Sequence, residues 1–123
     1  MAKSVHNDVL DAALNHLKNN AAQLSVCSTQ PATYAEATST YKLAITAIDS
    51  DDFNGPADGD TSGRKIQVND QNGVTVDSSG NAEHVAIVSS SDLLYVTTCT
   101  SQALTEGNQV SVPAWDIELA DPS

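Results

Sequence analysis

The chain has 123 residues, a length typical of one domain, and its 16 acidic and five basic residues give a formal net charge of −11. This charge disfavours binding to nucleic acid phosphates and to anionic membrane surfaces. No stretch approaches the roughly 20 apolar residues of a membrane-spanning helix, and the N-terminus lacks the apolar segment of a secretory signal. We therefore expect a single soluble domain over residues 1–123, made in the cytoplasm, with neither nucleic acid nor a membrane as partner.

Residues from about 4 to 21 are the one segment with a clear helical period. Apolar side chains recur there at three- and four-residue steps and are expected on one face: Val9, Leu10, Ala13, Leu14, Leu17 and Ala21. Ser4 or Asn7 is placed to cap the start, and Lys18 lies near the end, where the helix dipole favours a cation. The pattern predicts an amphipathic N-terminal helix that packs on a sheet.

The region of about 23–119 is typical of short strands separated by turns. Apolar and β-branched residues predict strands at 23–27, 41–48, 64–69, 74–76, 82–88, 93–100, 110–112 and 115–119. Strands this closely spaced, with short turns, indicate an antiparallel β-sandwich or barrel. We therefore predict a mainly β fold with one N-terminal amphipathic α-helix.

The segments between these strands carry most of the turn residues. We predict a loop at 28–40, although Thr33 and Glu36 have the spacing of a helical capping box. Residues 49–63, rich in acids and glycine, are predicted to be a surface loop, and 70–73 a turn that closes a hairpin. Pro113 is expected to offset the strand register or to mark an edge or a bulge.

The last predicted strand, Trp115–Leu119, alternates apolar and acidic residues, which is typical of a strand with one face in a core. We expect Trp115 to be a core residue. Most other core candidates are small aliphatic side chains, and such a core only just offsets the entropy lost on folding. Association with other subunits is therefore an expected source of stability.

Neither the cysteines nor the histidines have the spacing of a known site. Cys27 and Cys99 are 72 residues apart, so we interpret them as buried thiols, with a disulfide as the alternative if their strands are adjacent. His6, His16 and His84 have no convergent partners and are expected on the surface or in packing roles. No catalytic, cofactor-binding or metal-binding residue is predicted, and we do not expect an enzyme.

Asp58–Gly63 is the one stretch that suggests a ligand. It places oxygen-bearing side chains at alternate positions before a glycine, as calcium-binding loops do. However, Asn69 stands where such a loop has its bidentate glutamate, and Arg64 and Lys65 follow directly. A solvated turn, or a loop that contacts a basic neighbour, is therefore the preferred interpretation.

Two C-terminal stretches, Gly80–Cys99 and Gly107–Leu119, contain three short motifs in a defined order. They contain H-V-A-I-V, then L-L-Y-V, and finally G-N-Q-V-S-V-P. This order resembles the C-terminal part of small structural proteins of tailed bacteriophages, and Val5–Leu14 is similar to their opening. Together these segments make up about a third of the chain.

The resemblance implies a non-enzymatic virion protein without a cofactor, most like a capsid decoration or cement protein. Such a protein binds the exterior of the head, has the major capsid protein as partner, and commonly forms a homo-oligomer, with a trimer favoured. The first alternative is a tail, head-to-tail joining or fibre-base component. The second is a calcium- or carbohydrate-binding β-sandwich module, which would need an exposed aromatic platform.

Overall fold

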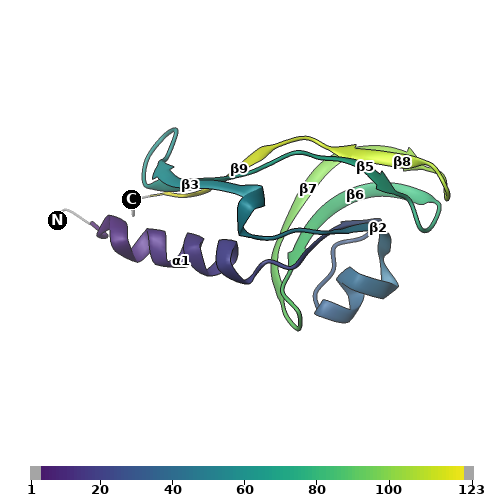
Figure 1. Cartoon of the computed structure of the whole chain (residues 1–123), viewed down its shortest axis with the longest axis horizontal. Coiled ribbons are helices and arrows are strands. Elements are labelled where there is room, and N and C mark those ends of the chain that lie inside the picture. The colour runs from purple at the N-terminus through teal and green to yellow at the C-terminus, as the bar shows by residue number, and fades with distance from the viewer. Residues whose placement is uncertain (1–3, 121–123) are drawn as a thin grey trace.

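The computed structural model describes residues 4–120 and contains one long helix followed by strands (Figure 1). The helix is α1 (Asn7–Asn20), and two short helical turns are η1 (Glu36–Thr40) and η2 (Ser50–Asp52). The strands of this part of the chain are β1 (Gln23–Cys27), β2 (Lys42–Ala47), β3 (Phe53–Asp58), β4 (Arg64–Val68), β5 (Gln71–Thr75), β6 (Gly80–Val88), β7 (Leu93–Leu104), β8 (Gln109–Val112) and β9 (Trp115–Leu119). The prediction of a mainly β, sandwich-like fold with an N-terminal helix is confirmed.

The strands pair in three antiparallel sheets. The largest has the order β2-β1-β6-β7, the second β3-β4-β9, and the third consists of β5 and β8. In Figure 1 the β5–β8 pair lies above β6 and β7, while α1 extends to the left beneath β3 and β9. Buried residues of α1 and of all three sheets form one hydrophobic cluster, which we call the main core.

The second and third sheets are two parts of one interrupted ladder. Val68 of β4 pairs with Trp115 of β9, and three residues further along each strand Gln71 of β5 pairs with Val112 of β8. The register is therefore the same on both sides of Pro113, which has no N–H and cannot donate to a ladder. The expected register offset at Pro113 is wrong. The predicted hairpin is also wrong, because β4 and β5 follow one another along the ladder and do not pair.

The predicted surface loop at 49–63 is mostly ordered secondary structure. Asp49 caps η2 with its carboxylate, and β3 then pairs with β4 from Phe53 onward. Phe53 is only 4% exposed and anchors this strand in the main core. The prediction failed because one buried aromatic among acids, glycine and proline gives no alternating pattern, and proline is tolerated in an edge strand such as β3.

Strand β1 and the second half of β6, Val85–Val88, are buried on both faces. Leu24 and Ile87 face the main core, whereas Ala86 and Val88 face a second cluster that includes Ala37 of η1. The segment predicted as a loop at 28–40 thus forms η1 and covers the outer face of the sheet. Its Thr33 Oγ1 accepts a hydrogen bond from the Glu36 N–H, as the capping-box spacing suggested.

A buried polar contact joins β1 to η1. Ser25 is fully buried, and its hydroxyl donates to the Ala37 carbonyl over 2.6 Å. This carbonyl belongs to the second residue of η1, and it also receives a weaker contact from the Cys27 thiol. Ser25 is therefore satisfied although it is enclosed by apolar groups.

Helix α1 packs against β3 and β4 with a narrower apolar face than predicted. Leu14 and Leu17 are buried, whereas Val9 is 60% exposed. Neither Ser4 nor Asn7 caps the helix: the N-cap is His6, whose Nδ1 accepts from the Asp8 N–H over 3.0 Å. A neutral imidazole nitrogen can serve as this acceptor, which the usual capping preferences do not favour.

Candidate interaction surface

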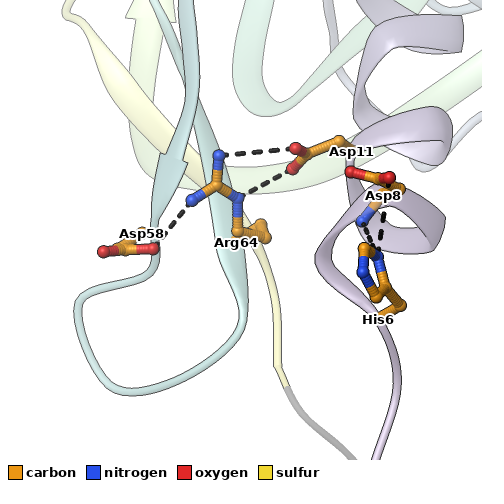
Figure 2. Close-up of polar contacts among 5 residues, drawn as sticks. All are labelled: His6, Asp8, Asp11, Asp58 and Arg64. Atoms are coloured by element: carbon orange, nitrogen blue, oxygen red, sulfur yellow. Dashed lines mark hydrogen bonds and ion pairs between the residues drawn. The ribbon is translucent and has the colours of Figure 1, made fainter.

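The acidic stretch beginning at Asp58 is held by Arg64. Figure 2 shows the Arg64 guanidinium between two carboxylates, with Nε 2.8 Å from Asp11 Oδ1 on α1 and Nη1 2.7 Å from Asp58 Oδ1. The hydrogen bonds that Arg64 donates to the carboxylates, first to Asp11 and then to Asp58, raise the pKa of Arg64. The guanidinium thereby ties the helix to the end of β3, since its planar donors can engage two acceptors at once.

Lys65, the next residue, also contacts two carboxylates. Its Nζ lies 2.6 Å from Asp60 Oδ1 and 3.3 Å from Asp116 Oδ2 of β9. The hydrogen bond and the charge of Lys65 lower the pKa of Asp60, and the two aspartates raise the pKa of Lys65. The Asp60 N–H also donates to the Glu118 carboxylate. The acids proposed as calcium ligands therefore contact basic neighbours, as in the preferred interpretation of this loop.

The basic side chains of residues 4–120 all have acceptors within the molecule. Besides Arg64 and Lys65, Lys18 donates to the Gly55 carbonyl over 3.2 Å, and Lys42 lies 3.2 Å from the Asp77 carboxylate. By contrast, several exposed acids have no ion pair in this part of the chain: Asp70, Glu83, Asp92 and Glu106. The surface of the described region is therefore anionic, with its lysine and arginine side chains already engaged.

The three histidines do not come together. His6 caps α1, His16 lies 3.4 Å from the Asn20 side-chain amide on the same helix, and His84 belongs to β6. Within residues 4–120, no group of three or more histidine, cysteine, aspartate or glutamate side chains is arranged to hold a metal ion.

The two cysteines are free and lie two strands apart. Cys27 pairs with His84, which pairs with Thr98, so β6 separates the cysteine-bearing strands and Cys99 points to the opposite face. Strand spacing then places the thiols about 10 Å apart or more, beyond the reach of a disulfide. Burial raises the pKa of both thiols, and nearby Glu83 adds to the rise at Cys99. Cys99 is only half-buried, unlike the prediction of two buried thiols.

The feature that sequence reasoning missed is the free edge of β7. This strand has 12 residues, none of them charged, and the described chain pairs it with β6 alone. Most of its side chains are half-buried or exposed, and only Leu104 is buried. The uncharged run from 93 to 105 is a visible signal in so acidic a chain, but its pattern alone predicts only a strand at 93–100.

Residues of β7 line three hollows, two of which define the candidate surface. The first, about 320 Å³, is lined by Leu94 and Tyr95 together with residues of α1 and β9. The second, about 330 Å³, is lined by residues 97–100 of β7 and by Pro113 and Trp115. Trp115 is thus half-buried at the margin of the main core, and its Nε1 is buried with no hydrogen-bond partner among the described residues. We call the β7 edge and these two hollows the β7 groove.

Comparison with protein-family models, with curated proteins and with solved structures returned no match. The helices of the described region include none that is long and apolar enough to cross a membrane. What residues 4–120 define is a class, namely a mainly β, sandwich-like protein with an N-terminal helix, an anionic surface and a long, uncharged sheet edge at β7.

Proposed function

We propose that this chain is a non-enzymatic structural protein of a tailed bacteriophage that decorates the outer surface of the head and braces neighbouring major capsid subunits. The observation that carries the proposal is the β7 edge of this groove, which is uncharged and which the described chain leaves unpaired, on an otherwise anionic molecule. A long edge without charge or proline is a liability for a protein that remains alone, because it invites pairing with another chain. It is a useful feature in a protein that works within an assembly.

The charge distribution supports binding to protein and opposes binding to packaged DNA. All basic side chains within residues 4–120 are engaged internally, so none is free for phosphate contacts. An anionic surface would instead complement basic patches on the exterior of a shell and would speed the encounter with them.

The resemblance of the C-terminal part to phage structural proteins is the reason for proposing a phage particle as the assembly. The resembling stretches, Gly80–Cys99 and Gly107–Leu119, include β6, β8, β9 and most of β7. These strands contribute the β7 edge and line both hollows. Some residues behind the resemblance, such as Leu94 and Tyr95, therefore also belong to the candidate interaction surface.

The test is the position of this protein on intact particles of the phage that encodes it. Particles are treated with a gold-labelled antibody against the chain, with pre-immune serum as control, and are imaged before and after a wash in high salt. We expect label over the whole head, reduced by the wash because exposed charge contacts are screened. Label restricted to the neck or tail would instead assign the chain to a joining or tail component, and unlabelled particles would exclude the virion proposal.

A further inference from the structure

We propose that the β7 groove binds an extended strand of another protein whose apolar side chains alternate and whose ends carry basic residues. The strand would extend the four-stranded sheet beyond β7 by backbone pairing, and its alternate side chains would enter the two hollows. This inference rests on the proposed function, because the partner would be a neighbouring protein of the same particle.

The first argument compares β7 with the other strand at the border of its sheet. The outer side of β2 is closed, since Ala44 bridges to Val76 and the Leu43 carbonyl accepts from the Asp77 N–H over 2.7 Å. No segment of the described chain covers the outer side of β7 in this way. Natural edge strands are usually protected by charge, proline or shortness, and β7 has none of these features.

The edge strand β3 in the neighbouring sheet shows the usual protection. It is half the length of β7, contains Pro56, ends in Asp58 and has an irregular register between Asn54 and Ala57. Each of these features discourages pairing with a second chain. The contrast indicates that the edge of β7 is kept open for a partner.

The second argument is the position of the hollows. Tyr95 pairs with Ile87 and Thr97 pairs with Val85, so the side chains of these β7 residues lie on the sheet face that carries the main core. The first hollow adjoins Tyr95, and the second adjoins Thr97 and Cys99. They thus follow one another along β7, and a strand paired with β7 would present every second side chain to the same face.

The third argument is charge, which selects the partner. Asp92 precedes β7 and Glu106 follows it, both exposed, while Asp116 and Glu118 line the first hollow. A second copy of this chain would bring another net charge of −11 to this rim. A strand with lysine or arginine at its ends would instead place opposite charges there, while its uncharged centre meets the uncharged edge.

The probe is a blocked peptide of about nine residues, with alternating valine and threonine in its centre and two lysines at each end. Trp115 is the only tryptophan of the chain and lines the second hollow, so its fluorescence reports occupancy directly. Amide hydrogen exchange of the full chain supplies the second readout. We expect a saturable shift of the fluorescence and slower exchange in β7, with β3 unchanged. A peptide that produces neither effect would refute the proposal.

Two modified peptides test whether the backbone pairs. Alternate amides of an extended strand point to opposite sides, so N-methylation of one alternate set blocks the edge that meets β7 and methylation of the other set blocks the solvent edge. We expect one set to abolish binding and the other to preserve it. Equal behaviour of the two methylated forms would overturn strand pairing. A peptide with glutamates at its ends should bind at least about tenfold more weakly.

A pair of variants tests the location. Thr98→Lys places a positive charge on the exposed part of β7, and Thr75→Lys makes the same change at an exposed position of β5. Thr98→Lys should weaken binding of the basic peptide by about tenfold, and Thr75→Lys should change it little. Equal effects would move the site away from β7. A dimer of the unmodified chain that Thr98→Lys dissociates, seen by analytical ultracentrifugation, would show that a second copy occupies the edge.

Failure of this inference is distinguishable from failure of the proposed function. Gold label over the heads without peptide binding would remove only the strand-pairing site. Peptide binding with no label on any particle would keep the site and remove the phage assignment.

Discussion

Strands β6 and β7 lie side by side in one sheet, and both have uncharged stretches, but for different reasons. Val85–Val88 of β6 is buried completely, between the main core on one face and η1 on the other. The partner residues on β7 are only half-buried, and the strand borders the two hollows of the β7 groove. Absence of charge in β6 follows from the cost of burying a charge, whereas in β7 it requires a different reason. Binding is the reason that we propose.

The largest difference between the two sides of this sheet should be seen in its cysteines. Cys27 of β1 is 0% exposed, whereas Cys99 of β7 lines the second hollow. Under native conditions iodoacetamide should modify Cys99 at least about a hundredfold faster than Cys27, because Cys27 becomes accessible only when the sheet opens. Both rates should be below that of a free thiol, because burial raises the pKa of each and leaves less thiolate.

Mass spectrometry of peptides from samples taken over time measures both rates. The control is the same reaction in guanidinium chloride, where the two rates should converge. Similar native rates would mean that β1 is as accessible as β7 and would remove the basis of the comparison. Formation of an intramolecular disulfide under mild oxidation would contradict the strand order.

Two truncations compare how much a residue of β6 and its paired residue on β7 contribute to the free energy of unfolding. Ile87 of β6 pairs with Tyr95 of β7, and the exposed fraction of Ile87 is 0%. Ile87→Ala should lower the free energy of unfolding by about 2 to 5 kcal/mol, as for other buried aliphatic side chains. Tyr95→Ala should cost clearly less, because Tyr95 is only partly buried. Urea titration of both variants supplies the comparison, and equal losses would mean that β7 belongs to the folded core as fully as β6 does.

A smaller loss of stability is expected from the hydrogen bond that joins β1 to η1, the segment that covers the outer face of β1. Ser25→Ala removes the hydroxyl that donates to the Ala37 carbonyl and should lower the free energy of unfolding by about 1 to 2 kcal/mol. The Cys27 thiol, at 3.7 Å, is too weak a donor to replace it. Ser91→Ala, in the exposed turn before β7, is the matched control and should be nearly neutral. An unchanged midpoint for Ser25→Ala in urea would show that η1 does not depend on this hydrogen bond.

Sequence patterns predicted the elements whose side chains alternate between the core and water, and they failed where a strand lacks this alternation. Trp115–Leu119 alternates plainly and is a strand with the predicted bounds. Nothing near Phe53 showed that Val68 would pair with it, so β3 was taken for part of a loop. The β7 groove could not be predicted either, because an open edge is defined by what fails to pair with it in three dimensions.

The smallest expected effect is the pH-dependent contribution of Lys65 to the stability of the fold. Lys65 forms ion pairs with Asp60 and Asp116, in contrast to the uncharged strand β7. The pKa of Asp60 is below its ordinary value of 3.8, so its ion pair stabilises the fold above that pH and is lost as pH falls through the lowered pKa. The pKa of Lys65 is above its ordinary value of 10.5, so the stabilisation is full below that pH and is lost as pH rises through the raised pKa.

Lys65→Met should therefore lower the melting temperature slightly near pH 7, with the difference vanishing toward both limits and shrinking in high salt, because Asp60 is exposed. Lys65→Arg, which keeps the charge, should follow the unmodified chain when both are melted by circular dichroism across the pH range. A difference that persists unchanged at acid pH would mean that Lys65 acts through packing of its aliphatic stem against β9 and not through its ion pairs.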